Sequence, residues 1–371
     1  MGLTIQIYTR EREKAVGEFN RRIKKGGCPF QFPDTSRPTW LPPEINQPMF
    51  EEYFLACEGE VVRGGYILKR QLFWDGRTTA EAGCVYLPLS EGAVDKQFSQ
   101  IALQMLRNAL KTQPRLFSLG MGGFHNPYPR LLKAAGWSLC TVPFYFRIVS
   151  PVAFLKNFTM ARRAPAARIL MDALAVTGIG WLGIKCLQHL FAGRSTPPEG
   201  HVLELVSNFE EWTDQLWEQG RNQYKLTAVR DAATLNRLYP PTKKKYLRLK
   251  VSKDGVPIGW AVMLATRFPA HKQFGNMRIG SVIDCFAASG SETVVAQAAT
   301  QLLEQHGADI IATNQSHRSW CSAFARAGHW RGPSNFIFAG SPRLIKDITP
   351  FNELKTSMHF TRGDGEGPSH L

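Results

Sequence analysis

The sequence predicts a mixed α/β protein made of two similar units that are joined by an apolar helical connector. Three observations support this fold class. The chain has 371 residues, of which 44% are hydrophobic, and this is enough material for two cores. An Ala-Gly pair followed by an aromatic strand occurs near the end of each half, and a stretch without charges lies between the halves. We expect units at 1–150 and 203–342, a connector at 151–202 and a tail at 343–371.

Each unit begins with a hairpin signal. Turn residues at 58–60 separate two apolar runs within 53–74, and turn residues at 253–255 do the same within 246–265. A short apolar strand follows each hairpin, and a helix with one apolar face follows each strand. We expect these strands at 82–89 and 279–287.

The second part of each unit predicts another strand, another helix and a closing aromatic strand. The strands are expected at 116–121 and 309–313, and the helices at 128–135 and 318–327. The separation from Ala135 to Phe144 equals that from Ala327 to Phe336. Each unit therefore has the order hairpin, strand, helix, strand, helix, strand, and we expect each closing strand to complete its own unit.

The central part of the connector, 162–194, includes the charge-free stretch 173–184. This stretch is shorter than the ~20 apolar residues of a membrane-spanning helix. One interpretation is a buried helix between the units, and the other is a helix on an anionic membrane surface that uses Arg162, Arg163, Arg168 and Lys185. The N-terminus lacks the apolar run of a signal peptide, so we expect a cytoplasmic protein, with attachment to the inner face of the membrane as the second interpretation.

The charge and the cysteines restrict the classes of partner. The formal net charge of +15 favours an anionic partner such as a phosphorylated cofactor, tRNA or an acidic lipid surface. The seven cysteines are scattered and form no Cys-x-x-Cys pair, which argues against a metal site and against a disulfide scaffold. No zinc-finger or helix-turn-helix signature indicates DNA binding.

The element order, with Ala-Gly ending the last helix before an aromatic strand, resembles the GNAT acyltransferase superfamily. The second half carries 314-NQSH-317, 332-GPSNF-336 and 362-RGDGEGP-368. With these segments it is similar to tandem-GNAT proteins of bacterial exopolysaccharide gene clusters, which are related to Fem-type peptidyltransferases. The resemblance covers roughly 45–150 and 203–342, and it implies the GNAT fold in each unit and an acyl-group donor.

The resemblance also implies where acyl-CoA, for example acetyl-CoA, would bind. GNAT enzymes hold its pyrophosphate on backbone N–H groups at the helix after the fourth strand, where the helix dipole favours anions. The matching positions here are Gly92 and Ala93 in the first unit, and Ser289, Gly290 and Ser291 in the second. Neither segment has the usual Arg/Gln-x-x-Gly-x-Gly/Ala pattern, and Glu91 and Glu292 add negative charge. The alternative is that Ser289 and Glu292 form a helix capping box.

Polar residues after the next strand of each unit are candidates for catalysis and acceptor binding. His317 is a candidate general base, beside Asn314, because strand ends and helix starts gather polar groups. Asp284 lies within an apolar strand and is either a buried structural acceptor or a catalytic base. The substrate-binding candidates are His125, Asn126, Gln315, Ser334, Asn335, Arg362, Asp364 and Glu366. The glycine-rich tail is either disordered, or it places the carboxylates of Asp364 and Glu366 where they bind a cation or an amine.

Three functions follow from these observations. The first is an acyltransferase that acts on an amine or hydroxyl of a cell-envelope or exopolysaccharide precursor. The second is a Fem-like transferase that uses aminoacyl-tRNA, and the third is a non-catalytic GNAT-fold scaffold in a polysaccharide assembly complex.

Overall fold

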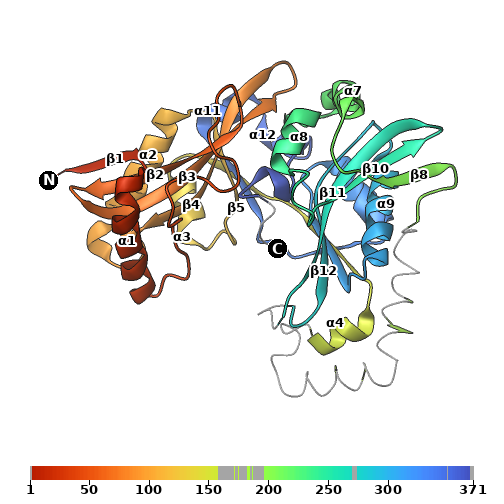
Figure 1. The fold of residues 1–371 in the computed structure, drawn as a ribbon, viewed down its shortest axis with the longest axis horizontal. Helices are drawn as coiled ribbons and strands as arrows, with labels where there is room; N and C mark the ends of the chain where they lie inside the picture. The colour runs from red at the N-terminus through yellow and green to blue at the C-terminus, as the bar shows by residue number, and fades with distance from the viewer. Residues whose placement is uncertain are drawn as a thin grey trace.

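The computed structural model describes residues 2–157, 196–269, 274–348 and 350–367, with a few isolated positions between 171 and 186. The predicted connector helix lies outside the described residues apart from those positions. Figure 1 shows two lobes side by side, one formed mainly by the first half of the chain and the other mainly by the second. Among the described residues, no helix has the length and apolar composition needed to cross a membrane.

Each lobe is built on a mixed sheet. The first sheet has the order β1-β2-β3-β4-β5-β15-β6, and β9 and β16 extend it beside β3. Its strands are β1 (Leu3–Ile7), β2 (Phe50–Glu58), β3 (Val61–Trp74), β4 (Thr79–Ser90), β5 (Leu116–Gly120), β6 (Ser138–Thr141), β9 (Leu226–Ala228), β15 (Ile337–Gly340) and β16 (Met358–His359).

The second sheet has the order β14-β7-β13-β12-β11-β10-β8. Its strands are β7 (Phe144–Ile148), β8 (His201–Leu205), β10 (Leu247–Lys253), β11 (Val256–Arg267), β12 (Arg278–Ala287), β13 (Ile310–Asn314) and β14 (Trp330–Gly332). Both expected hairpins, β2–β3 and β10–β11, are confirmed with their turns at the expected positions.

Helices cover the faces of both sheets. In the first half they are α1 (Glu13–Lys25), α2 (Gln100–Thr112), α3 (Pro127–Ala134) and α4 (Pro151–Asn157). In the second half they are α7 (Glu211–Gly220), α8 (Ala232–Leu238), α9 (Glu292–Gln305), α10 (Arg318–Arg326), α11 (Pro342–Asp347) and α12 (Phe351–Leu354). The apolar spacing expected for α2 is confirmed, since Ile101, Met105 and Leu106 are buried in the core of the first sheet.

The closing aromatic strands are exchanged between the two units, and this corrects our expectation that each completes its own unit. Strand β7, from the first half, lies between β13 and β14 of the second sheet. Strand β15, from the second half, lies between β5 and β6 of the first sheet. In Figure 1 the yellow strand that leads to α4 accordingly runs in the second lobe.

A short link gives a physical reason for the exchange. Only Val142 and Pro143 separate β6 from β7. The usual two-residue hairpins need a positive φ at the first or at both central residues, which a β-branched residue disfavours and proline cannot adopt. The chain therefore continues from β6 into the other sheet instead of turning back.

Residues predicted to act on substrate hold this crossing. Ser334 donates its hydroxyl to the Val142 carbonyl at 2.6 Å, and the Gln315 backbone N–H donates to the Pro143 carbonyl at 3.0 Å. The Asn314 amide lies 3.4 Å from the Pro143 carbonyl. These three contacts join the exchanged strands where they pass from one lobe to the other.

Candidate active site

The parallel strands β4 and β5 separate soon after they meet. Their backbones pair only at Gly83–Leu116 and Cys84–Phe117. Beyond Cys84 strand β4 continues through an irregular stretch, and Leu87 in this stretch has a φ of 47°. This φ is unusual for a residue other than glycine, and such bulges often lie beside functional sites. The two strands thus leave a gap between them.

A cavity of about 300 Å³ lies beside this gap. Its walls come from the end of β4, the loop after it, α2 and α3. The lining is mostly apolar, with a small number of hydroxyls, as is usual for small-molecule sites. It includes Val85, Pro88 and Ser90 of β4, Gly92 and Ala93 of the loop, Ser99, Ala102 and Met105 around α2, and Tyr128 and Leu131 of α3.

The loop between β4 and α2 is tightly built. The Gly92 N–H donates to the Ser90 hydroxyl at 3.1 Å, and a Cβ added at Gly92 would lie 2.5 Å from the Phe98 carbonyl oxygen. Glu91 is buried and bonds Arg22 at 2.7 Å and Arg63 at 2.9 Å. The negative charge that seemed unfavourable for an anion in this loop is therefore neutralised by two arginines.

Tyr128 places a hydroxyl beside the gap. Its oxygen lies 2.9 Å from the Ser118 hydroxyl, which in turn bonds the Val85 carbonyl at 2.7 Å. Because Ser118 donates its single proton to that carbonyl, Tyr128 is the donor to Ser118. Burial raises the pKa of Tyr128. Tyr128 is therefore a protonated hydroxyl at neutral pH.

The second unit has a tryptophan where the first has Tyr128. Seven residues before Ala135 is Tyr128, and seven before Ala327 is Trp320. Trp320 is fully buried, donates its Nε1–H to the Tyr224 hydroxyl at 3.0 Å, and stacks on His359. A large buried ring therefore takes the place of the hydroxyl that borders the cavity of the first unit.

Similar solved structures share this architecture. An N-myristoyltransferase of Saccharomyces cerevisiae, solved with myristoyl-CoA and inhibitors, is similar with a TM-score of 0.53 at 9% identity, over 91% of this chain and 79% of that one. A probable N-acyltransferase of Enterococcus faecalis is similar with a TM-score of 0.52 at 9% identity, over 93% and 74%. A GCN5-related N-acetyltransferase of Anabaena variabilis is similar with a TM-score of 0.50 at 10% identity, over 91% and 72%.

The chain has the GNAT fold. At these identities the likeness establishes the fold and nothing finer. No protein-family model and no curated protein matches the sequence. The second unit repeats the separation of β4 from β5. Its strand β12 pairs in parallel with β13 only from Ile279 to Val282.

Asp284 lies at the equivalent separation in the second GNAT unit, within a buried ion-pair network. Arg230 contacts Asp284 at 3.0 Å and Asp364 at 2.9 Å, and all three side chains are almost completely buried. Asp284 also accepts from the hydroxyls of Tyr239 and Thr361, both at 3.1 Å. Burial raises the pKa of Asp284 to about 6, although Arg230 opposes this.

The network reaches from the second sheet to the first through the tail. Lys69 of β3 is fully buried and donates to the Asp364 backbone carbonyl at 2.7 Å, and Arg362 donates to Asn314 at 2.9 Å. The disorder interpretation of the tail is wrong for 361–367, because Gly363, Asp364 and Gly367 are buried. The structure thus brings Asp284, Asn314, Arg362 and Asp364 together, while Glu366 is exposed.

The remaining predicted residues lie elsewhere. His317 is buried at the start of α10 against the Tyr224 ring, and burial lowers its pKa to about 4, which makes it a weak base at neutral pH. His125 and Asn126 lie on an exposed loop, and Gly123 of this loop lies close to Asn335. The capping box expected at Ser289 and Glu292 is wrong: the helix cap is Ser291, without a side-chain cap bond, and Ser289 and Gly290 are exposed.

Sequence reasoning missed three residues of the first unit. Glu51 of β2 is buried and bonds the Tyr86 hydroxyl, and Tyr128 borders the cavity. Glu51 lies two residues before the hairpin predicted at 53–74, so the sequence did not place it in a strand, whereas β2 begins at Phe50. An alignment of the two units on their Ala-Gly pairs could have singled out Tyr128, because the second unit has a tryptophan at the corresponding position.

Proposed function

We propose that this protein is an acyl-CoA-dependent acyltransferase whose donor site is the cavity of the first GNAT unit. The observation that carries the proposal is the apolar cavity of about 300 Å³ beside the separated strands β4 and β5. Its lining is mostly apolar, with the hydroxyls of Ser90 and Ser99 near the start of α2, where the helix dipole favours an anionic group such as a phosphate. Gly92, Ala93 and Ser99 would contact that group.

Bound acyl-CoA would supply an activated thioester to the site. The neutral hydroxyl of Tyr128 borders the cavity and would give a proton to the leaving thiolate. The second unit is proposed to be non-catalytic, with its corresponding space taken by Trp320. In this arrangement the second unit contributes β15 and the tail to the first.

For the acceptor we propose an amine or hydroxyl of a cell-envelope or exopolysaccharide precursor, on the resemblance of the second half to tandem-GNAT proteins of such gene clusters. A cytoplasmic enzyme at the inner face of the membrane would meet such an acceptor. Salt-sensitive sedimentation with anionic vesicles is expected for the full chain, and no sedimentation at low salt would contradict the membrane attachment.

Filling the cavity is expected to abolish donor binding. The Ala102→Trp variant puts an indole into the cavity from α2, so acetyl-CoA affinity measured by calorimetry should fall by roughly 100-fold or more. Gln104→Trp is the matched control, since Gln104 is exposed on the same helix and outside the lining, and its affinity should equal that of the parent protein.

Other outcomes would change the assignment. Equal acetyl-CoA binding by both variants would show that the cavity is not the donor site. If the parent protein binds no acetyl-CoA but binds tRNA with a steep salt dependence, the Fem-like function replaces the proposal. If the protein binds neither acetyl-CoA nor tRNA but captures polysaccharide-assembly proteins, the non-catalytic scaffold function is favoured.

A further inference from the structure

A second cavity, of about 370 Å³, lies where the two halves of the chain meet. Leu72 of β3 and Thr79 of β4 line it from the first half, and α7, Val229 and the start of α8 line it from the second. The Val229 N–H donates to the Leu72 carbonyl at 2.9 Å, so the two halves are joined beside the cavity. Thr79 begins β4, whereas Ser90 of the donor cavity ends it, and the two cavities are therefore separate sites.

One face of α7 forms a wall of this cavity. The face consists of Asp214, Trp217, Glu218 and Arg221, at the helical positions i, i+3, i+4 and i+7. Trp217 is buried and gives the wall an apolar surface. The charge of Arg221 is already compensated, because its guanidinium bonds Glu218 at 2.8 Å and lies 4.4 Å from the centre of the Trp74 ring. Asp214 therefore receives no cation from this helix.

Two carboxylates meet at one corner of the cavity. The Asp214 Oδ1 accepts from the Ala232 N–H at 2.7 Å, and Ala232 directly follows Asp231. The Asp231 Oδ1 accepts from the Thr234 N–H at 2.8 Å. The second oxygen of each carboxylate has no partner among the residues that the structure describes. In a chain with a net charge of +15, two acids without a cation at one corner favour a cationic ligand.

The part of the wall at Arg221 has the opposite requirement. The Arg221 Nε–H and the Trp74 indole N–H are buried and have no acceptor within the described ranges. Trp74 is 7% exposed, pairs with Thr79 across the strands and lies against Arg221, and both of these neighbours line the cavity. Buried donors are normally satisfied by an acceptor, so an oxygen atom of a ligand would stabilise this part of the wall.

The carboxylates suit an organic cation better than a metal ion. A metal site needs several side-chain ligands, and the described part of the chain contains no group of three or more His, Cys, Asp or Glu residues that could hold a metal ion. An ammonium group has three donors and can bond the free oxygens of both carboxylates with charge-assisted hydrogen bonds.

We propose that this cavity binds a small primary amine whose carbon chain carries an oxygen acceptor at its other end. The ammonium group bonds Asp214 and Asp231, the carbon chain lies against Trp217 and Leu72, and the oxygen accepts from the Nε–H of Arg221. Asp214 and Arg221 are two helical turns apart, about 10 Å, so a chain of several carbons separates the two polar ends. The site lies away from the donor cavity and does not depend on acyl transfer.

The test is calorimetry of the full chain at low salt with aminohexanol, which has an amine at one end and a hydroxyl at the other. We expect a dissociation constant below about 1 mM, rising with salt because the attraction between charges is screened. Hexanol lacks the ammonium group and should bind roughly tenfold more weakly or worse. Hexylamine lacks the oxygen and should bind about threefold more weakly.

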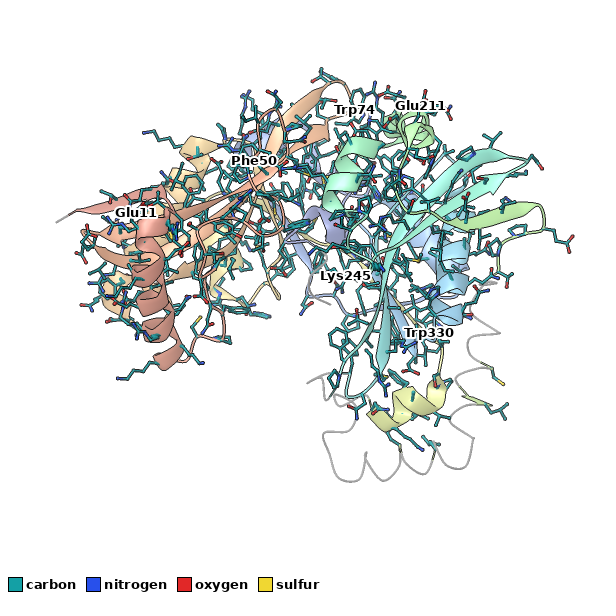
Figure 2. The ribbon with its side chains drawn as sticks, in the orientation of Figure 1. Glu11, Phe50, Trp74, Glu211, Lys245 and Trp330 are labelled. Atoms are coloured by element: carbon teal, nitrogen blue, oxygen red, sulfur yellow. The ribbon has the colours of Figure 1, made fainter. Side chains whose placement is uncertain are left out.

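Variants separate the charge from the shape of the cavity. Asp214→Asn and Asp231→Asn together should weaken aminohexanol binding by roughly tenfold or more, while asparagine still accepts from the backbone N–H groups and caps the helix. Ala233→Trp keeps the charges, fills the cavity and should also abolish binding. The matched control is Glu211→Gln, since Glu211, labelled in Figure 2, is exposed on α7 outside the lining, and its affinity should equal that of the parent protein.

Each outcome decides the amine site without reference to the donor cavity. Absence of aminohexanol binding by the parent protein at about 10 mM overturns the site, as does parent affinity in the double variant or in Ala233→Trp. Binding of magnesium chloride that the double variant loses, without binding of aminohexanol, would show a metal site instead. Failure of the parent protein to bind acetyl-CoA overturns the proposed function and leaves the amine site standing, because the calorimetry contains no acetyl-CoA.

Discussion

Production of either half alone, residues 1–157 or 196–371, is expected to give no cooperatively folded domain. The first half lacks β15, whose residues Ile337, Phe338 and Ala339 are fully buried, and without it β6 has no partner in the first sheet. The second half lacks β7, which pairs with both β13 and β14. Burial of each large apolar side chain stabilises by about 1.5–3 kcal/mol, so the loss of Ile337 and Phe338 alone removes roughly 3–6 kcal/mol of the 5–15 kcal/mol that is typical of a domain. The lost backbone pairing on both sides of the strand adds to this loss.

Joint production of the two halves should restore the fold. Each fragment supplies the strand that the other needs, so we expect a one-to-one complex by size-exclusion chromatography with a single thermal transition by circular dichroism. The control is the intact chain with a protease site inserted in 158–195, whose halves should remain associated after cleavage. A sharp thermal transition in either fragment by itself would contradict the strand exchange.

Replacement of Arg230 by Met is expected to destabilise the protein by about 3–5 kcal/mol, because Asp284 and Asp364 would be left buried without their cation. The measurement is the free energy of unfolding in urea at pH 8. Arg21→Met is the matched control: Arg21 has an exposed side chain 3.9 Å from Glu18, and its loss should cost less than about 1 kcal/mol.

A triple variant distinguishes the charge from the packing. The triple variant combines Asp284→Asn, Asp364→Asn and Arg230→Met. It removes the buried charges and keeps the side-chain volumes similar, so most of the lost stability should return. If the triple variant is as unstable as Arg230→Met, the network does not act through charge compensation. This variant also separates a structural role of Asp284 from the catalytic role considered for it.

The local order of elements was determined by the sequence alone. Turn residues at 58–60 and 253–255, apolar spacing in the helices and the two Ala-Gly pairs predicted the hairpin of each unit and the strands and helices that follow it. They did not predict the elements that precede each hairpin, which include α1 and α7. These signals are short in range, since turn chemistry and side-chain periodicity act within a few residues. The same reasoning selected Gly92 and Ala93, which line the cavity.

Pairing between distant segments was decided only by the tertiary structure. The strands beginning at Phe144 and near Phe336 are alike in composition, so either suits either sheet, and the choice depends on the path of the chain through Val142 and Pro143. Asp284 and Asp364 are charges of one sign whose cation, Arg230, is 54 residues from the first and 134 from the second. The sequence shows that a charged residue within an apolar run needs a partner when it is buried. Which residue is that partner depends on packing between elements that are far apart along the chain.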